Sequence, residues 1–336
     1  MTVTADARRA RPASLRGIVL VAAAAALVVV AVVSLFAGSK ATGVGDVLTA
    51  LGGGGDAFTR EVVAARIPRT VLGMLVGGAL AVAGVIVQGV TRNPLGDPGL
   101  LGVTVGASAA VVTAVALFDA TGGALVLAAL PGALLAALLV VAIGARSRGM
   151  VTLILAGAAL SAVLGAYIQA MTLLQPKVFD SFRHWVVGSL AGRGLDTAAQ
   201  VAPLLVLGFV LAIVLAPGLN SLALGDDVAA AQGVRVQRVR WGGIGAAALL
   251  CAAATAAVGP IAFVGLAVPH VARALVGPDH RWQLPAALLL GAGMLLAADI
   301  VARVVARPGE LMVGIVTAFV GAPFLLVAVR RGKALT

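Results

Sequence analysis

The chain has 336 residues, of which 61% are hydrophobic and only 11% are charged, and its mean hydropathy is +1.11. A soluble domain is typically about 25% charged, so this composition excludes a soluble protein. The net charge of +11 would indicate a nucleic-acid partner in a soluble protein, but these basic residues lie mainly between apolar runs and indicate orientation in a membrane. The single cysteine excludes an internal disulfide, and the three histidines lack metal-ligand spacing, so no cofactor or metal site is expected.

Ten apolar segments predict an all-α polytopic membrane protein, because a helix needs about 20 apolar residues to cross a bilayer. The predicted spans are residues 17–37, 70–90, 99–118, 124–145, 150–172, 200–217, 241–258, 260–276, 284–304 and 311–329. Together they form one transmembrane domain, residues 17–329, between short tails at 1–16 and 330–336. The first segment is interpreted as an uncleaved span and not a signal peptide, since it is long and many spans follow.

The distribution of basic residues favours an N-terminus in the cytoplasm. Ten spans then put the C-terminus there as well, and 15 of the 24 lysines and arginines fall in inside segments. Residues 38–69, which include a glycine run, are predicted to be a loose outer loop. Residues 173–199 are predicted to contain a short helix in the outer interface, with aromatic side chains in the headgroup layer.

Residues 66–106 carry the most informative pattern in the chain. An RIPR motif at 66–69 precedes a glycine-dense apolar run, which ends in an NPLGDP turn at 93–98. Glycine and alanine let membrane helices approach closely. Proline-broken backbone at membrane depth is tolerated only where protein or a water-filled path covers it. The pattern therefore indicates part of a solute pathway and not a passive anchor.

A segment between spans six and seven, residues 220–234, predicts a short helix on the cytoplasmic surface. Asp226 and Asp227 suit its first turn, and Gly233 suits its C-terminal end. Apolar residues are unusual in a solvated loop, and this segment has three in Leu222, Leu224 and Val228. An ordinary loop helix is the alternative, but the apolar residues favour a docking surface.

Two features inside the spans could serve transport. Gly157, Ser161, Gly165 and Gln169 follow one another at spacings of four in span five, which places a small, polar stripe on one helix face. Such a stripe is either a packing face or a pathway lining. Asp299 in span nine would suit ion coupling, but an arginine four residues later can neutralise it, so a structural ion pair is favoured.

The chain lacks a G-x-x-x-x-G-K-[ST] motif, so it does not bind ATP by that route. If transport is driven by ATP, the ATPase is another chain. An intramembrane enzyme is disfavoured, because the spans show no catalytic cluster. An ion-coupled secondary transporter is the main alternative, and it would need unpaired acids within the membrane.

From about residue 60 to the C-terminus, the chain resembles the FecCD-type permease subunits of iron–siderophore, haem and cobalamin importers of the ATP-binding-cassette (ABC) class, which share the type II importer fold. The RIPR motif, the NPLGDP turn, the 220–234 segment and the runs at 259–281 and 309–326 occur in the family's order. The resemblance implies a transport subunit of a bacterial inner or plasma membrane, not an enzyme. It also implies a ferric siderophore-type solute. The expected partners are a cytoplasmic ATP-binding subunit dimer, a second permease copy or a paralogue, and an extracytoplasmic solute-binding protein, with no nucleic acid.

The resemblance also assigns roles to particular residues. Arginines implied to dock the binding protein are Arg66, Arg69, Arg303 and Arg307, although interfacial snorkelling is the alternative for each. Residues implied to couple the permease to the ATPase are Leu222, Leu224, Gly225, Asp226, Asp227, Val228, Ala229 and Gly233. The cytoplasmic gate is implied at Asn93, Pro94 and Leu95, with further gate residues unassigned among residues 150–152. The channel lining is implied along Gly157, Ser161, Gly165 and Gln169.

Overall fold

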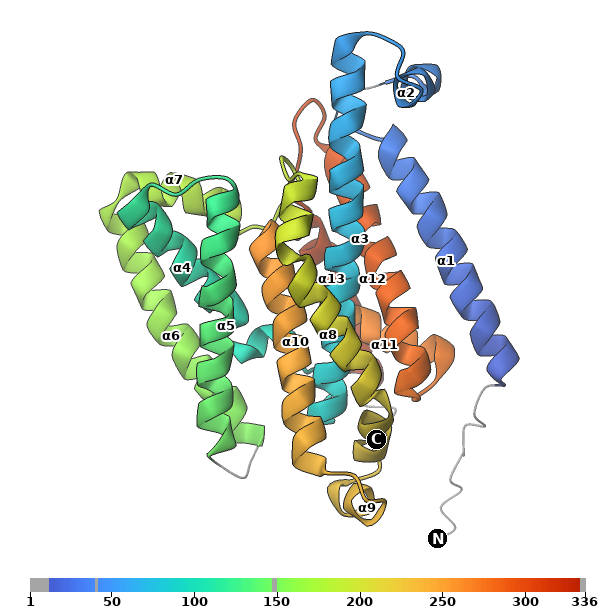
Figure 1. Cartoon of the computed structure of the whole chain (residues 1–336), viewed down its shortest axis with the longest axis vertical. Coiled ribbons are helices and arrows are strands. Elements are labelled where there is room, and N and C mark those ends of the chain that lie inside the picture. The colour runs from blue at the N-terminus through green and yellow to red at the C-terminus, as the bar shows by residue number, and fades with distance from the viewer. Residues whose placement is uncertain (1–11, 40–41, 147–149, 333–336) are drawn as a thin grey trace.

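The computed structural model describes residues 12–39, 42–146 and 150–332, and all regular structure within them is helical. Each of the ten predicted spans coincides with a helix, which confirms the all-α fold class (Figure 1). These helices are α1 (Ala13–Phe36), α3 (Ala57–Thr91), α4 (Val103–Phe118), α5 (Gly123–Ala145), α6 (Met150–Leu174), α8 (Leu195–Leu222), α10 (Val236–Val258), α11 (Val264–Val276), α12 (His280–Val305) and α13 (Val313–Gly332).

Seven of these helices are long and apolar enough to cross a membrane on their own. The shorter apolar helices are α4, α11 and residues 313–323 of α13. Before α4, the chain passes through a short 3-10 helix, η1 (Pro98–Leu101), which packs against α3, α6 and α10. Non-helical backbone at membrane depth is acceptable there because protein surrounds it.

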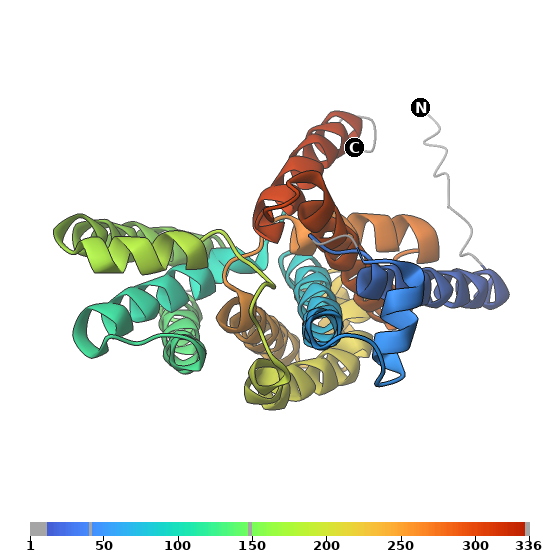
Figure 2. The same cartoon turned by 90° about the horizontal axis from the view of Figure 1, so that it is seen from above.

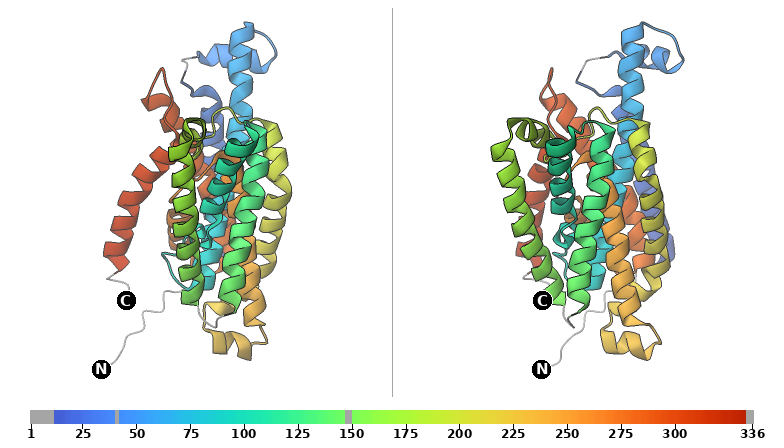
Figure 3. Two further views of the ribbon diagram at one scale, coloured as in Figure 1. Left: turned by 90° about the vertical axis from the view of Figure 1, so that its left-hand side faces the viewer. Right: turned by 60° about the vertical axis from the view of Figure 1, so that its left-hand side comes forward.

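Helix α3 forms the centre of the bundle. It packs against α12, α10, α11 and α8, and 83% of its most apolar window is buried, against 6% for α1. Helix α1 lies at the edge against α12 and α3 and leaves its other face open, as expected for a lipid-facing helix. Helices α4, α5 and α6 form a second group beside α10, and α13 diverges from the rest of the bundle (Figures 2 and 3).

Glycines allow α3 to lie at the centre. A Cβ on Gly84 would be 1.9 Å from the carbonyl oxygen of Gly265 in α11, and a Cβ on Gly77 would be 2.3 Å from that of Gly291 in α12. Backbone therefore meets backbone at both crossings, which only glycine permits. The glycine-dense run noted in the sequence is thus a helix-packing device.

The predicted loose loop at 38–69 is wrong, because most of this segment is helical. It contains α2 (Val44–Leu51), and α3 begins at Ala57, well before the predicted start of the second span at residue 70. Asp56 caps α3, since its Oδ2 accepts a hydrogen bond from the Thr59 amide at 2.9 Å. The predicted helix within 173–199 is present as α7 (Pro176–Trp185). The expectation that its aromatic side chains lie in the headgroup layer is wrong for Trp185, which is buried in the core.

The molecule has two distinct ends (Figure 1). We call one the α2 end, because it carries α2 and α7, and the other the α9 end, because it carries the short helix α9 (Asp226–Ala231). The first turn of α1 and the last turn of α13 both lie toward the α9 end (Figures 1 and 3). This matches an even number of crossings, although residues 1–11 and 333–336 of the predicted tails lie outside the described residues.

Candidate transport site and docking surfaces

The predicted short helix in the 220–234 segment is present as α9, with Asp226 and Asp227 in its first turn. Gly233 has a φ of +80° and its amide donates to the Ala230 carbonyl, while the Val234 amide donates to the Ala229 carbonyl. This pair of bonds is a Schellman motif, so the predicted glycine stop is confirmed. The helix is therefore fixed locally by its own sequence.

The apolar residues of this segment divide into two sets. Leu224 is 63% exposed and Val228 is 44% exposed, so both are available to a partner. Leu222 is fully buried in the last turn of α8, and Ala229 is fully buried on the inner face of α9. The expectation that Leu222 contributes to an exposed surface is therefore wrong, because α8 continues through it into the core.

The implied gate lies at the same end, directly after α3. We call residues 93–96 the gate turn. The Asn93 side chain accepts a hydrogen bond from the Leu95 amide at 2.9 Å, and the Asn93 carbonyl accepts one from the Gly96 amide at 2.9 Å. These bonds close a compact turn. Pro94 lines a cavity of about 260 Å³ together with Gln88, Arg92, Arg273 and His280, among others.

An ion pair that the sequence did not predict joins α9 to the C-terminal end of α3, next to the gate turn. The Asp226 carboxylate pairs with Arg92, the residue that ends α3, and with Arg240 of α10 at 2.9 Å. The hydrogen bond from Arg240 is the main cause that lowers the pKa of Asp226, and the charges of Arg240 and Arg92 lower it further against the effect of burial. Asp226 is therefore an anion at neutral pH that binds two cations from other helices.

The stripe on α6 is only partly packed. Gly157 is buried, Ser161 and Gly165 are half-buried and Gln169 is exposed. A Cβ on Gly165 would meet nothing within 4 Å, so close helix packing within the described chain does not account for this glycine. The half of the stripe that contains Gly165 and Gln169, its outer half, is therefore accessible to a molecule next to α6. Its use as a packing face is therefore restricted to the part near Gly157.

At the α2 end, two of the four predicted docking arginines are buried. Arg66 is 5% exposed and donates to the Leu35 and Phe36 carbonyls, at 2.9 and 3.1 Å. Arg303 is 1% exposed and donates to the Ser34 and Ala37 carbonyls, at 3.0 and 2.8 Å. The last carbonyls of α1 need donors, and α1 has no basic residue in its own last turn. The expectation that Arg66 and Arg303 are exposed is therefore wrong.

The other two arginines differ from each other. Arg69 is paired in bidentate fashion with Asp299 and also with Glu310 at 2.7 Å, and its side chain is only 11% exposed. Arg307 is exposed, and its Nε donates to the Gly38 carbonyl at 3.0 Å. Among the four, Arg307 has the accessibility that docking requires. The sequence showed the shared location of these residues but not their burial.

Asp299 is fully buried, and its carboxylate forms ion pairs with two arginines. Arg303 lies 3.0 Å from it and Arg69 lies 2.7 Å from it. The predicted structural ion pair is confirmed, with a second arginine that sequence spacing did not reveal. Because both carboxylate oxygens are occupied, Asp299 offers no free site for a coupling ion.

Glu310 should make the stability of this cluster depend on pH. Burial raises its pKa, but the hydrogen bond and charge of Arg69 lower it more, so the net pKa lies below its ordinary value near 4.5. A lowered pKa means that the contribution is fully present above that ordinary value and is lost as pH falls through the lowered one. We expect the melting temperature of Glu310→Gln to lie below that of the wild type by a constant amount at neutral pH, and the difference to shrink as the pH falls below the ordinary value and through the lowered pKa. A difference unchanged down to about pH 3 would contradict this assignment.

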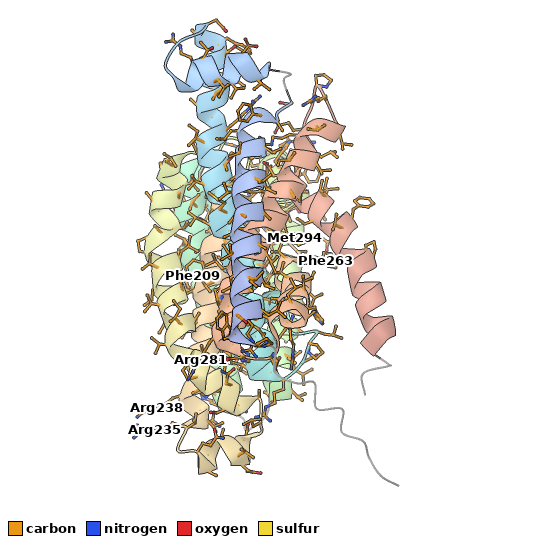
Figure 4. The ribbon with its side chains drawn as sticks, turned by 90° about the vertical axis from the view of Figure 1, so that its right-hand side faces the viewer. Phe209, Arg235, Arg238, Phe263, Arg281 and Met294 are labelled. Atoms are coloured by element: carbon orange, nitrogen blue, oxygen red, sulfur yellow. The ribbon has the colours of Figure 1, made fainter. Side chains whose placement is uncertain are left out.

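The described residues contain no group of three or more metal-ligating acidic, histidine or cysteine side chains. Basic side chains gather at the α9 end, where Arg235 and Arg238 project outward (Figure 4). The site therefore consists of surfaces, a gate turn and helix faces, which suit movement of a solute and contact with partners.

Comparison with known proteins gives a consistent result. The model of the FecCD transport family matches residues 26–331. The ferric enterobactin transport system permease protein FepD of Escherichia coli K12 is 48% identical over 311 residues, covering 91% of this chain and 92% of that protein. The Fe(3+)-citrate import system permease protein YfmD of Bacillus subtilis 168 is 39% identical over 270 residues, covering 80% of each. A solved structure described as an inward-facing conformation of a metal-chelate type ABC transporter matches with a TM-score of 0.84 at 30% identity, covering 94% of this chain and 99% of that one.

Proposed function

The chain belongs to the FecCD transport family, and we propose that it works as the membrane permease of an ATP-driven importer that carries a ferric siderophore. The observation that carries this proposal is the 48% identity, over nearly the whole of both chains, to a permease named for ferric enterobactin transport. The resemblance stated from the motifs is confirmed by the family match. As a multi-pass transport subunit, the chain belongs in the inner membrane and carries out no covalent chemistry.

We propose that the energy comes from a separate ATP-binding subunit. The sequence has no nucleotide-binding motif, and the α9 end exposes Leu224, which precedes α9, and Val228 of α9. Exposed apolar side chains on and next to a short surface helix suit insertion into a cleft of a partner. The basic residues at the α9 end favour its location in the cytoplasm, with both termini on that side.

The channel requires a second chain beside this one. Helix α6 is 11% buried in its most apolar window, and the outer half of its stripe is open. We propose that a second copy, or a paralogue, faces this stripe, so that Gly157, Ser161, Gly165 and Gln169 line a path between the two. The gate turn would close that path at the α9 end. The solute would arrive at the α2 end from a binding protein that contacts Arg307, with Arg66, Arg69 and Arg303 supporting the surface from beneath.

An ion-coupled secondary transporter is the second candidate, but its main support is lost. That mechanism needs an acid free to exchange an ion, and Asp299 is bound by Arg69 and Arg303. The ATP-driven mechanism is therefore favoured.

Uptake by cells that lack the chromosomal copy tests the cargo. Such cells, carrying the wild-type chain or an empty vector, would be supplied in turn with iron-55 bound to a catecholate siderophore, a hydroxamate siderophore or citrate, and with labelled cobalamin. We expect uptake of a ferric siderophore to require both the chain and an ATPase partner with an intact nucleotide site. Uptake of cobalamin alone would overturn the cargo assignment, and uptake of none of the solutes would count against import of this class.

Polar substitutions at Leu224 and Val228 test the proposed ATPase surface. We expect the double variant Leu224→Gln/Val228→Gln to weaken copurification of the ATPase subunit at least about tenfold, or about 1.4 kcal/mol, because apolar contacts are lost. Folding should be unaffected, since both side chains are exposed. The matched control is Leu48→Gln, at a 58% exposed position on α2 at the opposite end. Equal copurification of both variants would remove α9 from the interface.

A further inference from the structure

We propose that the ion pair between Asp226 and Arg92 transmits movement of α9 to the gate turn, so that these two residues position the gate during transport. The inference rests on the proposed function, since it needs a partner that moves α9. It assigns a role to Arg92, which no motif indicated, and a contact with the end of α3 to Asp226, which the resemblance implied only for coupling to the ATPase.

Helix α9 is a short unit bounded by a glycine bend at each end. Gly225 before it has a φ of +114° and Gly233 after it has a φ of +80°, conformations that other residues rarely adopt. Between these bends the helix is anchored by the buried Ala229 and by the Asp226 carboxylate. A partner that shifts α9 therefore shifts this carboxylate, together with whatever the carboxylate holds.

The Asp226 carboxylate binds arginines from two different helices. Arg240 belongs to α10, the next helix after α9, so this contact holds α9 against the helix that follows it. Arg92 lies 134 residues away in sequence, at the end of α3. Helix α9 packs otherwise against α8 and α10, so the pair with Arg92 brings the central helix of the bundle into contact with α9.

Arg92 is joined to the gate turn by the backbone itself. Its φ of +50° ends α3, and the next residue is Asn93. The hydrogen bonds of Asn93 to Leu95 and Gly96 make the turn a compact body, so a displacement at Arg92 carries the turn with it. Arg92 and Pro94 also line the same cavity of about 260 Å³, whose shape would change with the turn.

The ion pair between Arg92 and Asp226 is expected to contribute little to the stability of the fold. The side chains of Arg92 and Asp226 are 39% and 45% exposed, and exposed ion pairs contribute little to folding. Their location between a partner-facing helix and a gate gives the pair a use in coupling. Removal of the Arg92 charge should therefore uncouple the two movements and leave the fold intact.

The test uses the complete transporter, reconstituted in liposomes with its ATPase subunits and binding protein, and measures ferric siderophore imported per ATP hydrolysed. We expect Arg92→Gln to lower this ratio at least about fivefold, the lower end of typical coupling effects, while ATP hydrolysis changes less than about twofold. Asp226→Asn should lower the ratio at least as much, because it also weakens the contact with Arg240. Arg92→Lys keeps the charge and should retain most of the ratio. Arg238→Gln removes an equal charge from a side chain that projects outward, and it should match the wild type (Figure 4).

Two results would overturn the inference. One is a wild-type ratio in both Arg92→Gln and Asp226→Asn. The other is an equal loss in Arg238→Gln, which would assign the effect to the general charge of this surface. A failure of the proposed function is distinguishable, because the wild-type transporter itself would then import no ferric siderophore with ATP.

Discussion

Replacement of Asp299 with alanine is expected to destabilise the protein by about 3–5 kcal/mol, because it leaves Arg303 and Arg69 buried without their carboxylate. Asp299 is fully buried, and Arg303 is 1% exposed. These residues come from α12 and α3, and Arg303 also caps the end of α1. Loss of the carboxylate therefore affects three helices at the α2 end. We expect a large fall in melting temperature in detergent and low abundance in membranes.

The control for this variant is Asp180→Ala. Asp180 pairs with Arg183 at 3.2 Å, but both side chains are more than half exposed. Exposed pairs are worth about 0–1 kcal/mol, so this variant should melt close to the wild type. A similar melting temperature for the Asp299 and Asp180 variants would show that the buried cluster does not hold the three helices together.

Gly84→Ala is expected to be at least as severe, with a cost above about 3 kcal/mol, beyond the usual range for an added methyl group in a packed core. The new Cβ would lie 1.9 Å from the Gly265 carbonyl oxygen and 2.6 Å from its carbonyl carbon. Both obstacles are backbone atoms, so no side-chain rotation relieves the overlap. Helices α3 and α11 would have to separate along their contact. We expect little folded protein to be recovered after extraction.

Gly293→Ala makes the same chemical change in α12, where an added Cβ meets nothing within 4 Å. Alanine favours a helix over glycine by about 0.8–1.0 kcal/mol, so this variant should melt at or slightly above the wild-type temperature. Melting of the two glycine variants at the same temperature would contradict the proposed close packing of α3 on α11.

The sequence predicted the fold well, because hydrophobic length is a local property. A helix is present at each of the ten predicted positions, and the glycine and aspartate positions around α9 predicted that helix and its end. The start of α3 was missed because the apolar run that marks the span begins only at residue 70, whereas α3 extends back through the charged residues before it and contains Pro68 within its length. The capping signal at Asp56 was the available clue.

The candidate site was less predictable, because its contacts join distant parts of the chain. The pairs Arg92 with Asp226 and Arg69 with Asp299 depend on how helices meet, which spacing along the sequence does not record. The burial of Arg66 was missed for a similar reason. Its clue lay in α1, whose last turn has no basic residue to bind its own free carbonyls.

The most direct test of the ATP-driven import mechanism is solute uptake by proteoliposomes that contain this chain, its ATPase subunits and its binding protein. ATP would be supplied on the side of the α9 end, and ferric siderophore on the side of the α2 end. We predict accumulation of iron-55 that requires ATP hydrolysis and persists when a protonophore and a sodium ionophore abolish ion gradients. Uptake that continues without ATP but stops with the ionophores would contradict the mechanism and identify an ion-coupled transporter.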